Sequence, residues 1–295
     1  MTPRVLSWRR RSWLGAMAGG VAAAWGWPSW ARPTPLRLVS VSGALTEVVY
    51  VLGQQDKLVG VDSTSTYPDA AQRLPRVGYM RQLSAEGILS LRPTALLATT
   101  EAGPAAVIRQ LRDAGLRMHV VPVEYTWEDV RRKIEVVGEA TQAQSQARFL
   151  WQQIASARDE LQRRVAAVSA QSPQAIFVLG HGGSPLVAGR QTAGDAVLRL
   201  MGARNPLHDH YEGYRPLNAE ALAGLALDAV VTTRETVQAL GGEAQWWERP
   251  HWQAVLRRGK RPVLWYEDAL ALLGFGPRLP AVLRRGARAL GTWQG

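Results

Sequence analysis

The chain has 295 residues, with 35 lysines and arginines against 24 aspartates and glutamates, and its formal net charge is +11. With 46% hydrophobic and 20% charged residues it has the composition of a globular protein, which excludes disordered, collagen-like and disulfide-stapled classes. The absence of cysteine also excludes thiolate metal sites, iron–sulfur clusters and thiol nucleophiles, so any metal must be bound by oxygen or nitrogen.

Residues 1–31 have the pattern of a secretory signal peptide. Four arginines precede an apolar run over 13–27, and small residues follow at Ser29 and Ala31, the positions that determine cleavage. The run is shorter than the ~20 residues that a membrane-spanning helix needs, and the absence of cysteine removes a lipid-modified cysteine, so we expect an exported, soluble chain without a lipid anchor. Arg10 and Arg11 suit a twin-arginine signal and a general secretory signal equally.

The basic residues outside this leader do not predict a nucleic-acid partner. The leader contributes four units of the net charge of +11, and other basic residues recur at helical spacings, as in 109–117, 131–133 and 284–288. Solvated helix faces have this pattern, whereas a nucleic-acid site needs a contiguous basic stripe interleaved with aromatic residues.

Short apolar runs alternate with helix-like segments along the mature chain, and this alternation is typical of α/β proteins with parallel sheets. The expected strands are 38–41, 58–61, 95–99, 118–123, 175–179, 229–233 and 263–265. Between the two groups, 127–170 is a proline-free helical stretch, with Gly138 as its one breaker. We therefore predict two doubly wound parallel-sheet lobes, 32–126 and 171–295, joined by a long helix over 127–170 that is broken near Gly138.

An internal repeat supports two similar lobes. Residues 84–100 align with 218–233, and each copy starts with a helix-capping side chain, places a glutamate in the first helical turn and ends in a strand. A second match pairs 46–53 with 195–202. Two α/β lobes joined by a helix place a ligand cleft between them, where the carboxyl ends of strands from both lobes converge.

The loops that follow strands are where binding chemistry is expected. The loop 62–69 of the first lobe offers the phenol of Tyr67, and the loop 180–185 of the second lobe offers the imidazole of His181. From the residues alone, Tyr67 and His181 also suit ordinary loop positions, in which His181 would donate a hydrogen bond to a backbone carbonyl.

Six short motifs carry a resemblance that covers nearly the whole mature chain. They are STYP at 65–68, VGYMR at 77–81, SAEG at 84–87, GHGG at 180–183, LGG at 240–242 and LLGFGPR at 272–278. Taken together they resemble periplasmic haem-binding proteins that serve ATP-driven haem importers. That family belongs to the helix-linked class of solute-binding proteins, which also includes vitamin B12 and siderophore carriers.

The resemblance implies that Tyr67 is an axial ligand of ferric haem and that His181 approaches as the opposite ligand, although some members of the family use tyrosine alone. A phenolate is a hard oxygen donor that suits Fe(III). Because a free phenol loses its proton only near pH ~10, the ligand form needs help from the iron and from a cation, for which Arg234 is the candidate.

Haem also carries two propionates and two wide apolar faces. Guanidinium groups bind carboxylates through paired hydrogen bonds, so arginines in the cleft loops are candidates for the propionates. The candidates are Arg81, Arg190 and Arg73 for the propionates, and Tyr79, Met80 and Leu186 for the apolar wall.

The repeated first-turn glutamates, Glu86 and Glu220, have two interpretations that are compatible with each other. A carboxylate in the first turn stabilises a helix through its dipole by about 0.3 to 1 kcal/mol. In proteins that this chain resembles, such glutamates resemble docking points for arginines of an inner-membrane ABC permease. We accordingly expect a monomer in the periplasm that delivers haem to such a permease.

Catalytic motifs are absent from the sequence, which predicts a non-enzyme. No Gly-x-Ser-x-Gly elbow, phosphate loop or His-Glu-x-x-His helix is present. Two other kinds of cargo remain open: vitamin B12 or a ferric siderophore, and free Mn or Zn bound through histidines and carboxylates. The histidines available for such a metal are His119, His181, His208 and His210.

Overall fold

The structure is a computed structural model of the chain, in which residues 36–295 form one compact unit. It describes residues 35–168, 172–180, 185–217, 220, 222, 224–257, 259 and 261–293. The predicted leader, 1–31, and His181 lie outside the described residues. Within the described part of the chain, no helix combines the length and the apolar character needed to cross a membrane.

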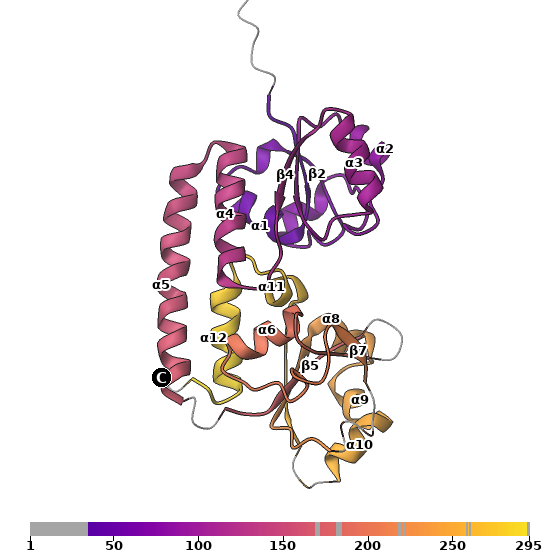
Figure 1. Cartoon of the computed structure of the whole chain (residues 1–295), viewed down its shortest axis with the longest axis vertical. Coiled ribbons are helices and arrows are strands. Elements are labelled where there is room, and N and C mark those ends of the chain that lie inside the picture. Colours follow the sequence, from indigo (N-terminus) through magenta and orange to yellow (C-terminus); the bar gives the residue numbers. More distant parts are fainter. Residues whose placement is uncertain are drawn as a thin grey trace, which may run out of the picture. The chain divides into compact units, whose positions relative to one another are not determined.

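The first lobe contains a parallel sheet in the order β2-β1-β3-β4 (Figure 1). Its strands are β1 (Leu38–Val41), β2 (Leu58–Val61), β3 (Ala95–Thr99) and β4 (Arg117–Val121). They are joined through α1 (Gly43–Val51), the 3-10 turns η1 (Gln55–Lys57) and η2 (Asp69–Arg73), α2 (Ala85–Leu89) and α3 (Ala105–Asp113). In β1, Leu38 packs into one apolar cluster and Val39 and Val41 into another, because successive side chains leave a strand on opposite faces.

The second lobe contains a sheet in the order β7-β6-β5-β8-β9. Its strands are β5 (Ala175–Leu179), β6 (Leu186–Ala188), β7 (Tyr214–Pro216), β8 (Ala229–Thr233) and β9 (Val263–Glu267). Its helices are α6 (Ala193–Leu200), α8 (Arg234–Ala239), α9 (Glu243–Glu248), α10 (Pro250–Leu256), α11 (Ala269–Leu273) and α12 (Leu279–Ala289). Ala175 and Phe177 of β5 face the apolar cluster that continues into the first lobe, whereas Ile176 and Val178 face a second cluster.

The two-lobed α/β prediction is confirmed, but the second sheet is mixed and not wholly parallel. The strands β5, β8 and β9 are parallel, while β6 pairs antiparallel with both β5 and β7. The reason is the length of the connection, since residues 180–185 between β5 and β6 are too few for the crossover of a dozen or more residues that a parallel pair requires.

The linking region consists of two helices, α4 (Trp127–Thr141) and α5 (Gln144–Val168), and the longer α5 packs against both α4 and α12 (Figure 1). The break comes after Thr141, where Gln142 adopts a left-handed conformation, and not at Gly138. Gly138 lies inside α4, where a Cβ atom would stand 2.6 Å from the Cβ of Ala147 on α5. The glycine therefore allows the two helices to approach closely.

Substituting Gly138 by alanine should lower the melting temperature. Alanine improves helix propensity by about 1 kcal/mol, but the clash with Ala147 should cost about 1 to 3 kcal/mol. Gly87→Ala is the matched control, because a Cβ at this exposed position of α2 meets only Ser84 at an ordinary 3.7 Å. In thermal unfolding the melting temperature of Gly87→Ala should equal or exceed that of the wild type, and that of Gly138→Ala should be lower. The reverse order would contradict the close contact between α4 and α5.

Candidate ligand-binding cleft

A cleft of about 430 Å³ lies between the two lobes, within the size range of small-molecule sites. Residues at the carboxyl ends of the first-lobe strands line one side, among them Thr64, Thr99 and Val123. Leu179 at the end of β5 and the segment 269–275 line the other side. The cleft thus lies where the repeat and the strand order predicted it.

The loop that carries Tyr67 is held by a buried carboxylate at the end of β2. Asp62 accepts hydrogen bonds from the backbone N–H and hydroxyl of Thr64, at 3.0 and 2.6 Å, and from the hydroxyl of Ser65 at 2.9 Å. Arg76 donates to the backbone oxygens of Asp62 and Ser65. Burial raises the pKa of Asp62, against the hydrogen bonds from Thr64 and Ser65, which lower it. These contacts fix the backbone leading into Tyr67.

Tyr67 lies in contact with a residue of the second lobe. Its side chain is 43% exposed, and the guanidinium carbon of Arg278 stands 3.9 Å from the centroid of its ring. Arg278 is the residue before α12, and the neighbouring Thr64 and Thr66 line the cleft. Tyr67 itself is not among the residues that line the cleft, and the structure places it beside the cleft, where loops of the two lobes meet.

Arg234, predicted to be the cation beside Tyr67, occupies a different place. It pairs with Glu267 at 3.3 Å and is half exposed, whereas Arg278 is the guanidinium against the tyrosine ring. Arg278 is therefore the guanidinium in contact with Tyr67 in this structure, and Arg234 as the cation that assists the Tyr67 phenolate stays a prediction. The neighbouring Glu235 does line the cleft.

The other predicted residues divide into two groups. Tyr79, Met80 and Arg81 line the cleft, and Arg81 forms an ion pair with Glu101, which also accepts a hydrogen bond from the Tyr125 hydroxyl at 3.2 Å. Three others are not among the residues that line the cleft: Leu186, Arg73 in the exposed turn η2, and Arg190, which pairs with Glu212 at 3.7 Å.

The histidine sites suggested for a free metal ion do not assemble in the described part of the chain, where no group of three or more histidine, aspartate or glutamate side chains could hold a metal. The Nδ1 atom of His208 lies 3.0 Å from both carboxylate oxygens of the buried Asp195. His119 belongs to β4, where burial lowers its pKa. The hydrogen bonds of His208 and the position of His119 within a strand are both typical of structural histidines.

The segment from Gly274 to Arg278 is bonded to the first lobe and to the linking helix by two buried charged side chains. Lys133 of α4 donates to the backbone oxygens of Gly274 at 2.7 Å and Phe275 at 3.2 Å. Glu47 of α1 accepts from the backbone N–H of Arg278 at 3.2 Å and from its Nε at 2.9 Å. Burial lowers the pKa of Lys133 to about 8 and raises that of Glu47, although Arg278 acts in the opposite direction on Glu47.

Sequence reasoning missed Glu47, Lys133 and Arg278, although two of them left a signal. Glu47 lies in the repeat 46–53 at a position where the second copy has Ala196. Lys133 shares a helical stripe with the buried Val130, Ile134 and Val137. A charged residue at a position that the pattern reserves for apolar side chains indicates a specific buried partner.

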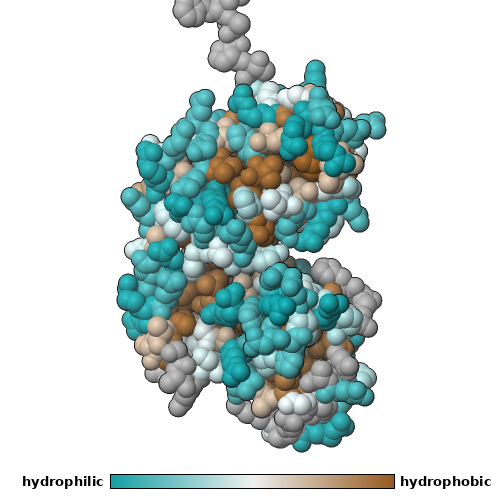
Figure 2. Space-filling view, in the orientation of Figure 1, coloured by the Kyte–Doolittle hydropathy of each residue, from teal (hydrophilic) through white to brown (hydrophobic). Residues whose placement is uncertain are grey.

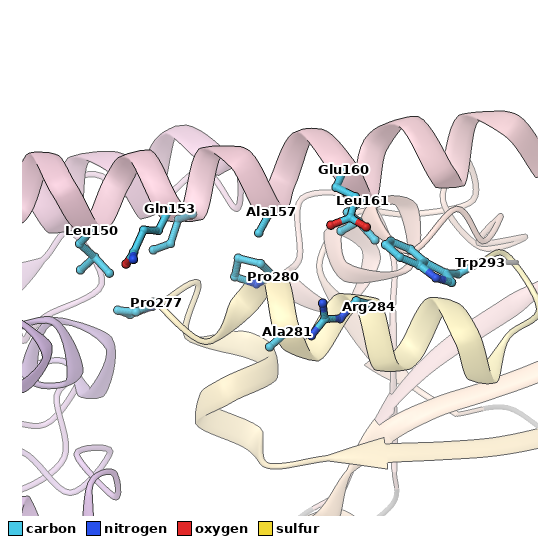
Figure 3. Close-up of a pocket in the computed structure, with 11 residues that line it drawn as sticks. Leu150, Gln153, Ala157, Glu160, Leu161, Pro277, Pro280, Ala281, Arg284 and Trp293 are labelled. Carbon is cyan, nitrogen blue, oxygen red and sulfur yellow. The ribbon is translucent and has the colours of Figure 1, made fainter. Parts of the chain in front are cut away.

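A second hollow, of about 260 Å³, lies between α5 and α12 (Figure 3). Its walls include Leu150 and Ile154 of α5 and Pro280 of α12, with Glu160 and Arg284 as charged members. None of the predicted site residues lines it.

Figure 2 shows a largely hydrophilic surface with apolar patches on both lobes.

The similarity of the chain to known proteins agrees with this architecture. The family described as periplasmic binding protein matches residues 38–255. The solved structure of the periplasmic heme-binding protein BhuT in complex with two hemes is 41% identical, covers 86% of this chain and 97% of its own, and has a TM-score of 0.79.

Two curated relatives are also similar. The uncharacterised ABC transporter substrate-binding lipoprotein YvrC of Bacillus subtilis (strain 168) is 30% identical over 205 residues, 68% of this chain and 65% of the relative. The vitamin B12-binding protein of Photorhabdus laumondii is 30% identical over 175 residues, 58% of this chain and 61% of the relative. The matches thus span less than two thirds of the length of either curated relative.

The contribution of the buried amine of Lys133 to the unfolding free energy should depend on pH. Its pKa is about 8 in the folded chain against an ordinary value of 10.5, so between these values the unfolded chain binds more protons and stability rises with pH. The unfolding free energy of the wild type minus that of Lys133→Met should therefore increase by about 3 kcal/mol across this window. Denaturant titrations at pH 7.5, 9 and 10.5 measure this, and a difference that stays level with pH would contradict a desolvated Lys133.

Proposed function

The chain belongs to the periplasmic binding protein family, and from that premise we propose that it captures ferric haem in the interlobe cleft and delivers it to an inner-membrane ABC importer. The observation that carries the proposal is the position of Tyr67, which lies half exposed beside the cleft with a cation over its ring. A phenolate oxygen is a ligand that suits Fe(III). The 41% identity to a haem-binding protein supports the same cargo.

The other tyrosines of the cleft support the choice of Tyr67. Burial, with Glu101 close by, raises the pKa of Tyr125, and burial raises that of Tyr214 to about 12. Forming the phenolate, the stronger iron ligand, therefore costs more at these two positions than at a tyrosine with an ordinary pKa. Tyr79 is 42% exposed and lines the cleft, and we assign it to the wall beside the macrocycle.

Apolar and charged groups of the cleft suit the rest of the cargo. Met80, Leu270, Leu273 and Phe275 offer apolar contacts to a porphyrin face. We propose that Arg81 binds a propionate in exchange for Glu101. His181 is proposed as the opposite axial ligand, and Arg190 and Arg234 as further cations that would leave Glu212 and Glu267 to reach the cargo.

Delivery requires export and a partner, and both parts of this proposal come from the sequence. We propose that residues 1–31 direct the chain to the periplasm and that 32–126 and 171–295 act as lobes joined by 127–170. Glu86 is exposed in the first turn of α2, where Ser84 caps the helix by accepting from the N–H of Gly87, and Glu220 is likewise exposed in the second lobe. We propose these two carboxylates as docking points for arginines of the permease.

Vitamin B12 is the second candidate cargo, because a relative that is 30% identical is a vitamin B12-binding protein. Adding hemin and cyanocobalamin separately to the purified mature protein distinguishes the two. A ferric spectrum with a tyrosinate charge-transfer band at one equivalent of hemin supports haem. Saturable binding of cobalamin without binding of hemin would replace haem by vitamin B12.

Substituting Tyr67 by phenylalanine should remove the axial oxygen while keeping the ring. We expect the tyrosinate band of the hemin complex to disappear and the affinity for hemin to fall at least about tenfold, since a ligand bond is lost. Tyr79→Phe is the matched control, because it removes the hydroxyl of an equally exposed tyrosine that lines the cleft next to which Tyr67 lies. An unaltered spectrum in Tyr67→Phe would exclude Tyr67 as the ligand.

Reversing the charges of Glu86 and Glu220 to lysine should separate binding from delivery. Hemin affinity should persist in Glu86→Lys/Glu220→Lys, because neither residue lines the cleft, while haem uptake by cells carrying the permease should fall. The control is Glu243→Lys, an exposed first-turn glutamate on α9. Normal uptake by the double variant would contradict docking through these residues.

A further inference from the structure

The motif LLGFGPR at 272–278 contains the joint between the lobes, and its last residue makes contacts that ligand binding alone does not explain. Arg278 reaches Glu47 of the first lobe through Nε at 2.9 Å and Asp268 of the second lobe through Nη1 at 3.2 Å. Its Nη2 is buried and has no hydrogen-bond partner among the described residues. The guanidinium carbon lies 3.9 Å from the ring centroid of Tyr67.

These contacts fix the guanidinium in one orientation. Glu47 is 1% exposed and accepts from both the backbone and the side chain of Arg278, which makes a two-point hold. Asp268 is itself fixed, because its carboxylate caps α11 by accepting from the N–H of Ala271 at 2.8 Å. A planar guanidinium held on two edges has its flat face left for a ring, and this face is the one that stacks on aromatic groups.

We propose that Glu47 is a positioning residue for Tyr67 that acts through Arg278. This inference rests on the proposed function, in which the phenolate of Tyr67 binds iron. A cation over an aromatic ring is attracted by the negative charge of the ring face, and it stabilises the phenolate more than the neutral phenol. Glu47 keeps that cation over the ring. Without its carboxylate, the partly exposed guanidinium can turn toward Asp268 and solvent.

The burial of Glu47 fits such a role. A buried carboxylate is costly unless a cation and hydrogen bonds compensate it, and at Glu47 Arg278 supplies both. The second copy of the repeat has Ala196 at this position, so the helix itself does not require a glutamate there. Gly276 lies against the same region, since a Cβ added to it would meet Ala44 at 3.6 Å and the Glu47 carboxyl carbon at 3.8 Å.

The test is Glu47→Gln, which keeps the shape and removes the charge. In the hemin-loaded mature protein we expect the tyrosinate charge-transfer band to shift and haem transfer to excess apomyoglobin to become about 3- to 10-fold faster, as loss of an oriented cation over a ring implies. Glu128→Gln is the matched control, because it makes the same change in a carboxylate of α4 that pairs with Arg131 and not with Arg278. The control should have the wild-type band and transfer rate.

A second variant keeps the inference testable if Glu47→Gln does not fold. Glu47→Gln/Arg278→Met leaves neither charge buried alone, and it should show an equal or larger band shift and release that is at least as fast. A folded Glu47→Gln, or failing that the folded double variant, with the wild-type band and transfer rate would overturn the inference. Failure of the proposed function differs visibly, because then the wild type itself lacks a tyrosinate band with hemin.

Discussion

Arg278 extends from the second lobe into the first, where the carboxylate of Glu47 accepts from its Nε at 2.9 Å. The carboxylate end of this interaction is removed from water, since the side chain of Glu47 is 2% exposed against 26% for that of Arg278. A buried ion pair of this kind adds little net stability, because the desolvation of both charges offsets most of their attraction. Its contribution is geometric: it sets how the segment 274–278 lies against α1, and with it the edge of the cleft and the ring of Tyr67.

Lys133 completes the same joint from the linking helix. Its ammonium faces the backbone oxygens at the end of α11, where the negative end of a helix favours a cation. Three charged side chains from α1, α4 and the start of α12 therefore meet around one short glycine-containing segment. The small residues allow this segment to approach α1 and α4 closely, and the three charged side chains fix its position against them. Lobe motion in this molecule is consequently expected to begin with these three residues.

A cleft built in this way suits a carrier that must also release its cargo. One phenolate, or a phenolate with a weak partner, binds ferric iron firmly but allows it to leave. Several polar groups of the cleft already have protein partners, as in the Arg81–Glu101 ion pair and the hydrogen bond from Tyr125 to Glu101. A ligand carboxylate that enters must exchange with such contacts, so both binding and release replace one set of partners by another.

The sequence by itself determined the strands, the alternation of strands with helices and the repeat, because each depends on apolar residues that are close in the chain. The strands at 38–41, 58–61, 95–99, 175–179 and 229–233 agree with β1, β2, β3, β5 and β8. The predicted strand 263–265 ends two residues before β9, which runs to Glu267. The prediction missed β6 and β7, because each has only three residues, too few for a periodic pattern.

The tertiary structure alone decided the antiparallel pairing of β6, the end of α4 after Thr141 and the contact of Arg278 with the ring of Tyr67. Each depends on groups that are distant in the chain or on the space between packed elements. Glu47 and Arg278 are 231 positions apart, and no local pattern indicates which of many arginines a buried glutamate will meet. Gly138 likewise has the sequence signal of a helix breaker, and only the proximity of Ala147 makes it a packing residue.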